Sequence, residues 1–304
     1  MKDRVFWKKP EHSLLSQLGH TMVDMHFHTS YSDGNASIPD LIKRAKMMGI
    51  GVAVTDHNEI GGAVEAFKNR EGVLVIPGIE VSCIEGPHIL LYFYNHKELI
   101  SFFENFLRWK KNGNPFMATK ATVKEVLNEA SRYNCVKVAA HPFGYMGVNC
   151  GLLKTVDKDY VEPNLLRKID GVEVICGAMN RHLNKKAKKY AESHNMLYTG
   201  GTDGHCLFQL GKVVTLGKGK TPKEFLNSIK KKENILIGKE SQYFPKVLSA
   251  STTVRTHLHY AYPSVKIQTK IFYQRTVHLR KKITGKLIHN GLTRQVGKIA
   301  MRRM

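Results

Sequence analysis

Between residues 23 and 240 the sequence alternates short apolar runs with amphipathic segments, and this pattern constrains the fold more than any other feature. Several apolar runs have the length and β-branched content of strands: 23–28, 51–57, 72–82, 88–94, 136–141, 171–175, 196–201 and 212–216. Helical spacing of apolar positions follows residues 37, 61, 96, 121, 179 and 220. Strands and helices in alternation predict an α/β fold with a parallel sheet, open or closed into a barrel.

The charge is distributed unevenly. The chain carries a net charge of +22, and residues 241–304 contain thirteen Lys or Arg and no Asp or Glu. We therefore expect an N-terminal extension at 1–21, a barrel domain at 22–240 and a basic C-terminal extension at 241–304. Such a basic segment favours polyanions: nucleic acid first, and an anionic membrane surface less strongly. A solvated tail and packing against a partner subunit are the alternatives, and the sequence does not determine the oligomeric state.

The fold of the basic segment is ambiguous from its sequence. Some of its apolar positions have helical spacing, which predicts one or two amphipathic helices, whereas 264–272 alternates as a strand would.

The cellular location is expected to be the cytoplasm. The sequence has no run of eighteen apolar residues, and its first residues lack the apolar stretch of a signal peptide. The five cysteines are odd in number and far apart, which predicts reduced, mostly buried thiols rather than a disulfide framework.

Nitrogen and oxygen ligands gather where the predicted strands end. His26 and His28 are two residues apart, so in a strand both imidazoles lie on one face with Phe27 on the other. The other candidates at strand ends are Asp56, His57, Glu80, His141, Glu173, Asp203 and His205. Because the carboxyl ends of parallel strands in a barrel meet at one mouth, we expect these side chains to form one site.

This set of donors favours a metal centre. Imidazoles and carboxylates without thiolate suit divalent ions such as Zn²⁺, Mn²⁺ or Fe²⁺, and more ligands than one ion needs imply two or three ions. Glu80 is the natural bridging carboxylate. Metal pairs activate water and neutralise charge on phosphoryl oxygens, which predicts hydrolysis of a phosphate ester. No GxSxG elbow, no Cys–His nucleophile pair and no P-loop is present.

Six stretches resemble, in order and spacing, the successive motifs of the PHP (polymerase and histidinol phosphatase) family: DMHFHTSYSDG, AVTDHNEIGG, PGIEVS, AAHPF, GVEVICG and GGTDGH. The resemblance covers about residues 22–238. It implies a distorted (β/α)7 barrel with two or three metal ions at the strand ends, hydrolysing phosphate esters through a metal-bridging hydroxide.

The resemblance also implies a role for each site residue. The first metal would be held by His26, His28, Glu80 and Asp203. The second would be held by Asp33, His57 and His205, and the third by Glu80, His88 and His141. His88 matches the family pattern most loosely. Glu80, Asp203 and His205 are the expected catalytic residues, and Asp56 and Glu173 would orient ligands by hydrogen bonds.

Three polar residues near these motifs have open roles. Asn58 either orients His57 or contacts the substrate, and Arg181 and Lys185 either form a solvated helix face or pair with a substrate phosphate.

The function predicted is that of a metal-dependent phosphoric ester hydrolase. Its substrate could be a phosphomonoester, a nucleotide or a nucleic-acid end. One alternative is a nucleic-acid-binding protein with a metal-stabilised barrel and little turnover. Another is a two-metal hydrolase of C–N or carboxylic ester bonds.

Overall fold

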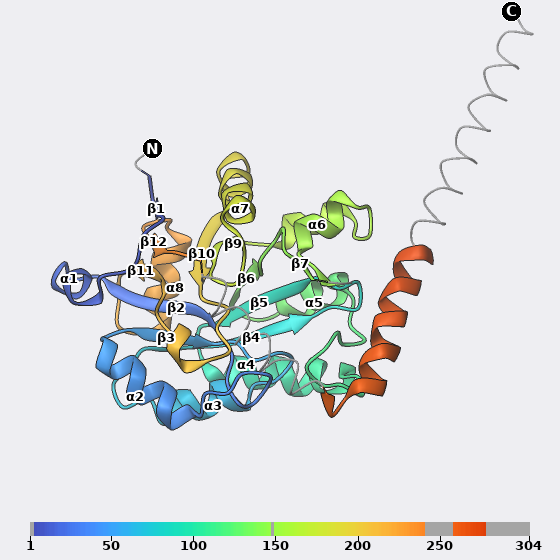
Figure 1. Ribbon diagram of the computed structural model, residues 1–304, viewed down its shortest axis with the longest axis horizontal. Helices are drawn as coiled ribbons and strands as arrows, with labels where there is room; N and C mark the ends of the chain where they lie inside the picture. The colour runs from blue at the N-terminus through green and yellow to red at the C-terminus, as the bar shows by residue number, and fades with distance from the viewer. Residues whose placement is uncertain (1–2, 147–148, 241–257, 278–304) are drawn as a thin grey trace, which may run out of the picture.

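A curled sheet of ten strands forms the centre of the computed structural model, which describes residues 3–146, 149–240 and 258–277 (Figure 1). The order of the strands in the sheet is β1-β12-β11-β2-β3-β4-β5-β6-β9-β10. Their bounds are β1 Val5–Phe6, β2 Thr21–Phe27, β3 Gly51–Val54, β4 Val75–Ser82, β5 His88–Phe93, β6 Cys135–Ala139, β9 Gly171–Cys176, β10 Leu197–Gly201, β11 Val213–Gly217 and β12 Ile235–Gly238. A separate pair is formed by β7 Tyr145–Met146 and β8 Asn149–Cys150.

Helices connect most of these strands. Their bounds are α1 His12–Gln17, α2 Ile38–Met48, α3 Gly61–Lys68, α4 His96–Phe102, α5 Val123–Ala130, α6 Leu152–Asp157, α7 Arg181–Ser193 and α8 Pro222–Lys230. The predicted strands and helices are therefore present. The ends of α2 show why: the Ser37 side chain accepts a hydrogen bond from the Asp40 amide, and Gly49 ends the helix with a left-handed φ of 66°. Within the residues that the structure describes, no helix is long and apolar enough to cross a membrane.

The sheet closes on itself at the ends of β2 and β10. The Asp203 amide donates to the His26 carbonyl at 2.9 Å, and the His28 amide donates to the Gly204 carbonyl at 2.9 Å. Gly201 permits this approach, because a Cβ there would lie 2.4 Å from the His26 amide nitrogen. The strands from β2 to β10 thus form the distorted (β/α) barrel that the sequence predicted.

The sheet departs from the expected all-parallel arrangement at two strands. β5 runs antiparallel to both β4 and β6, and β11 runs antiparallel to both β2 and β12, while β2, β3 and β4 are parallel to one another. The start of β5 therefore lies at the same edge as the carboxyl ends of its neighbours.

A register shift in β2 sends its histidines inward. The pairing of β2 with β3 shifts between Asp24 and Phe27. Val23 and Met25 pack in the inner apolar cluster, whereas Phe27 packs in the outer one, although alternate residues of a regular strand share a face. Because of this irregularity Phe27 faces outward instead of sharing the inner face with Val23 and Met25, and His26 and His28 face the inside of the barrel; β-bulges near sites commonly re-aim side chains in this way.

Two apolar layers hold the barrel together. The inner cluster is formed by strand residues such as Ile76 and Leu90 and is closed at the bottom by Phe225, Leu226 and Ile229 of α8. The outer cluster lies between the sheet and the surrounding helices. The five cysteines are free and buried, as expected, and Cys83 and Cys135 belong to the outer cluster. Because the bottom is filled by side chains, the polar mouth is the open end of the barrel.

The two predicted extensions contribute to the described structure. β1 pairs in parallel with β12 at the edge of the sheet. Residues 261–277 form a helix that packs on Met117 and Ala118 and is drawn in orange-red at the right of Figure 1. The strand interpretation of 264–272 is therefore wrong, because Ile267 and Ile271, one helical turn apart, are the residues that this helix buries. The rest of the basic segment, at 241–257 and 278–304, lies outside the described residues.

Candidate metal centre

Four side-chain atoms converge at the base of the mouth, at the ends of β2, β4 and β10. His26 Nε2 lies 3.1 Å from His28 Nε2, 3.4 Å from Glu80 Oε2 and 3.5 Å from Asp203 Oδ1. His28 Nε2 lies 3.4 Å from Glu80 Oε2 and 3.3 Å from Asp203 Oδ1. A tetrahedral ion with bonds of about 2.1 Å separates its ligand atoms by about 3.4 Å. The spacing of these atoms therefore fits a divalent ion between them.

Unpaired buried atoms support the same interpretation. His28 Nδ1 and Glu80 Oε2 are buried and form no hydrogen bond, although Glu80 Oε2 also lies 3.0 Å from His57 Nδ1. Buried polar atoms in proteins are nearly always paired, so an orphaned lone pair requires an explanation. A cation supplies one, because it satisfies lone pairs without a proton.

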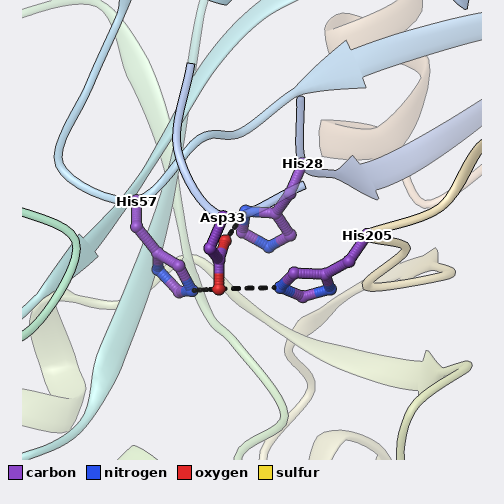
Figure 2. A group of neighbouring side chains, drawn as sticks. All are labelled: His28, Asp33, His57 and His205. Atoms are coloured by element: carbon purple, nitrogen blue, oxygen red, sulfur yellow. Dashed lines mark ion pairs between the residues drawn. The ribbon is translucent and has the colours of Figure 1, made fainter. Parts of the chain in front are cut away.

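A second group surrounds Asp33, which follows β2 (Figure 2). Asp33 Oδ2 lies 3.2 Å from His205 Nε2 and 3.9 Å from His57 Nε2. His28 joins this group, with its Nδ1 at 3.9 Å from Asp33 Oδ1, so its two ring nitrogens face two different groups. One ligand atom from each of these four residues lies within 4.8 Å of the others.

A third group surrounds the other oxygen of Glu80. Glu80 Oε1 lies 3.2 Å from His88 Nδ1 and 3.1 Å from His141 Nε2, whereas Oε2 faces His26 and His28. The carboxylate thus has one oxygen in each of two groups, as expected of a bridge. His88 reaches the mouth because it begins the antiparallel strand β5.

Buried carboxylates orient these donors. Glu173 Oε1 is 2.9 Å from His26 Nδ1, and its Oε2 accepts from the His141 amide at 2.8 Å. The resulting Nδ1–H tautomer of His26 leaves the Nε2 lone pair facing the other donors. Asp56 accepts from the Thr29 amide and hydroxyl and from the Ser32 hydroxyl, each at 2.7 Å, which fixes the turn before Asp33. Both residues therefore act as orienting groups in this structure.

The backbone is strained at three positions around the mouth. Asn58, His141 and Asp203 have positive φ values of 51°, 28° and 50°. Left-handed backbone is unfavourable for residues other than glycine and persists only where the surroundings enforce it. Each of these residues directly follows a site residue or is one itself, so the strain is concentrated where side chains must be aimed inward.

Burial and neighbouring charges set the protonation states of the candidate metal ligands. Burial would raise the pKa of the Glu80 carboxyl, but His57, His26 and His88 hold it well below its usual range. Burial disfavours charged His57, but Glu80 and Asp33 outweigh it and raise the pKa of His57 to about 9. Burial and the nearby His205 and His57 lower the pKa of His28 to about 4. A cation entering the site would therefore displace protons from some of the histidines.

Two polar residues with open roles have structural partners. The Asn58 side chain donates to the Pro115 and Met117 carbonyls at 3.1 and 2.8 Å and accepts from the Ser82 amide at 2.9 Å, so it braces the segment that follows His57. Arg181 Nε donates to Glu240 at 2.7 and 2.8 Å, which accounts for its charge without a substrate phosphate.

Sequence reasoning missed Asp24 and Cys176. Asp24 accepts hydrogen bonds from the Thr202 amide at 2.9 Å, the Thr202 hydroxyl at 2.7 Å and the Gly211 amide at 3.0 Å. These bonds connect β2 to Thr202, which directly follows β10, and to Gly211 at the end of the next loop. Its position two residues before His26, inside an apolar strand, was the available signal. Cys176 Sγ donates to Asp203 Oδ2 at 3.6 Å, a contact that no sequence pattern indicates.

Comparison with known proteins identifies the family. The model of the PHP domain matches residues 24–262. The chain belongs to the PHP domain family. The resemblance of its six motifs to that family is thereby confirmed.

Relatives of this PHP domain are distant. An uncharacterized protein of Methanocaldococcus jannaschii is 40% identical over 83 residues, which cover 23% of this chain and 48% of that protein. The chain thus spans about half the length of the curated relative it matches.

Two solved structures have a similar fold. A protein of Bifidobacterium adolescentis, described as a metal-dependent phosphoesterase, is 20% identical, with a TM-score of 0.50 and coverage of 68% of this chain and 94% of that chain. Endonuclease Q, solved with a 27-mer duplex substrate that has an abasic lesion at the active site, is 20% identical, with a TM-score of 0.60 and coverage of 73% and 60%.

Proposed function

We propose that this PHP domain is a metal-dependent hydrolase of phosphoric esters. The observation that carries the proposal is the set of 3.1–3.5 Å separations among His26 Nε2, His28 Nε2, Glu80 Oε2 and Asp203 Oδ1. Two or three divalent ions would be held by the three groups: His26, His28, Glu80 and Asp203; Asp33, His57 and His205; and Glu80, His88 and His141. When bound, they would supply Lewis-acid stabilisation of phosphoryl oxygens and acidify water.

The donor set favours Zn²⁺, Mn²⁺ or Fe²⁺. All of its atoms are imidazole nitrogens or carboxylate oxygens. The nearby thiol of Cys176 is a poor ligand, because burial, together with Glu173 and Asp203, raises its pKa well above the ordinary value.

Exposure indicates the side from which a substrate approaches. The side chains of His26 and His28 are 0% exposed, whereas those of Asp203 and His205 are 11% and 12% exposed. His205 Nδ1 lies 3.1 Å from the Asp203 carbonyl, and donation there leaves the Nε2 lone pair facing Asp33. The side chains of His57, His88 and His141 are 11%, 13% and 15% exposed, so exposure marks the whole outer rim of the mouth. We propose that the substrate contacts this rim, with Asp203 and His205 as the catalytic residues above the buried bridge Glu80.

Metal reconstitution tests the proposal. Chelator-stripped protein should hydrolyse a generic chromogenic phosphate ester after Mn²⁺, Zn²⁺, Fe²⁺ or Mg²⁺ is added, and His28→Gln should lose activity at least a hundredfold. His182→Gln, which changes an exposed histidine of α7, is the matched control and should keep it. Amide and carboxylic ester substrates assayed in parallel test the alternative hydrolase chemistry. Absence of turnover with every ion would refute the proposal.

We infer that the substrate class is a polynucleotide. The outer face of the 261–277 helix presents Lys266 and Lys270 beside Tyr262, Phe272 and Tyr273, whose exposed fractions are 79%, 66% and 66%. Cations attract phosphates and exposed aromatic rings stack on bases, so this combination suits a nucleic acid. The similar fold of Endonuclease Q, which was solved with a 27-mer duplex substrate, adds support.

Charge removal tests this second proposal. Replacing Lys266 and Lys270 together by Gln should weaken binding of a labelled oligonucleotide and lower the slope of log K against log salt by about 2. The double variant Lys124→Gln and Lys223→Gln removes the same charge from exposed positions on α5 and α8 and should bind as the unmodified chain does. Equal binding by both variants would refute the role of this face.

A further inference from the structure

The helix at 261–277 is fixed to the barrel by one of its faces. Ile267, Ile271 and Arg275 are spaced four residues apart and are only 3%, 0% and 9% exposed. Ile267 and Ile271 pack on Ala118 in a small apolar cluster of their own. This face is therefore built to contact the barrel rather than to extend from it.

One path of contacts leads from this helix to His57. The Asn114 side chain donates to the Ser264 hydroxyl at 3.0 Å, and Ala118 packs on the helix. Between these two residues, the Pro115 and Met117 carbonyls accept from the Asn58 side chain at 3.1 and 2.8 Å. Asn58 directly follows His57 and has a positive φ of 51°. The helix thus supports the segment that holds this strained residue.

A second path leads to His88. Arg275 donates from Nε and Nη2 to the Glu85 carbonyl at 3.0 and 2.8 Å, and its guanidinium lies 4.8 Å from the centre of the Tyr160 ring. Glu85 belongs to the turn between β4 and β5, which begins after Ser82 and ends at His88. Burial of a guanidinium is costly unless its donors are used, and here two of them fix one carbonyl of this turn.

Both paths end at the same group of candidate ligands. His57, Glu80 and His88 offer ligand atoms that lie within 4.8 Å of one another. His57 is supported through Asn58, and His88 follows the turn that Arg275 holds, while Glu80 lies in the strand between them.

We propose that the 261–277 helix sets the positions of His57 and His88 around Glu80, with Arg275 as a positioning residue. This inference rests on the proposed metal-binding role of the three residues. It predicts that loosening the helix weakens, as one class of sites, the ions proposed to be held through His57 and through His88. The ion between His26, His28, Glu80 and Asp203 is retained, because neither path of contacts includes His26, His28 or Asp203.

Metal titration of the full chain tests the proposal without a substrate. Chelator-stripped protein is titrated with Zn²⁺ against a chromogenic competing chelator, and bound metal is counted by elemental analysis. Arg275→Met should lower the affinity of one class of sites at least tenfold and leave the tightest class unchanged. Arg275→Lys, which keeps a donor and the charge, should recover part of the loss. Lys124→Met removes a charge from an exposed position on α5 and should titrate as the unmodified chain does.

The outcomes separate this inference from the hydrolase proposal. Selective weakening supports the positioning role even if no phosphate ester is hydrolysed. Unchanged affinities in Arg275→Met, or equal weakening of every class, would overturn it. Ile271→Ala loosens the helix without removing a charge and should weaken metal binding at the same class of sites, so it tests the inference if Arg275→Met does not fold. Circular dichroism and a thermal melt establish folding of each variant.

Discussion

Replacement of Glu173 by Gln tests how strongly an orienting carboxylate controls the metal centre. Glu173 is 1% exposed, and its two oxygens interact with His26 Nδ1 at 2.9 Å and the His141 amide at 2.8 Å. Gln has nearly the same shape but keeps a single acceptor oxygen. In the variant, the remaining side-chain oxygen accepts one of the two hydrogen bonds as a neutral acceptor. The Gln side-chain nitrogen replaces the other oxygen and faces a donor, so the second hydrogen bond is lost.

The expected loss follows from these two bonds. A hydrogen bond to a charged group contributes about 1.5–3 kcal/mol and a neutral one about 0.5–1.5 kcal/mol. Removing one charged bond (about 1.5–3 kcal/mol) and neutralising the other (about 1–1.5 kcal/mol) therefore costs about 2.5–4.5 kcal/mol, and the lower limit corresponds to roughly a hundredfold in affinity. Changes in groups that orient metal ligands typically cost about 10–100-fold. We expect Glu173→Gln to weaken metal binding within this range.

Competition titrations at several pH values measure the effect. Burial opposes charged His26, but Glu173, Glu80 and Asp203 raise its pKa well above the ordinary value, so metal must displace a proton and its affinity rises with pH. Loss of the Glu173 charge should make this dependence shallower. Glu192→Gln makes the same chemical change on the exposed face of α7 and should leave both quantities unchanged. Unaltered affinity in Glu173→Gln would refute the orienting role.

Two further predictions concern stability. Gly201→Ala should lower the free energy of unfolding in urea by about 2 kcal/mol or more, because its Cβ would lie 2.4 Å from the His26 amide nitrogen. Gly200→Ala, whose nearest contacts are at 3.3 Å, should lower it less. Equal losses in the two variants would contradict the close contact between β2 and β10. Burial raises the pKa of Asp24 from 3.8 to about 6. Since protonation then favours the folded state, metal-free protein should lose about 2 kcal/mol relative to Asp24→Asn as pH rises from 4 to 7, and a gap independent of pH would refute this.

Local sequence determined the elements of this barrel and the candidates for its site. The spacing of His26 and His28 indicated two imidazoles on one face, and the structure has both of their Nε2 atoms in one group. Ser37 and Gly49 cap the two ends of α2, and local sequence is sufficient for this because capping depends on residues within one helical turn.

Tertiary structure decided the features that depend on distant partners. The direction of β5, and hence the arrival of His88 at the mouth, is set by pairing with β4 and β6 and not by the sequence of the strand itself. Residues 264–272 had both helical and alternating patterns, and packing of Ile267 and Ile271 on Ala118 selects the helix. Short-range patterns specify local conformation, whereas strand direction and packing partners depend on contacts between residues far apart in the chain.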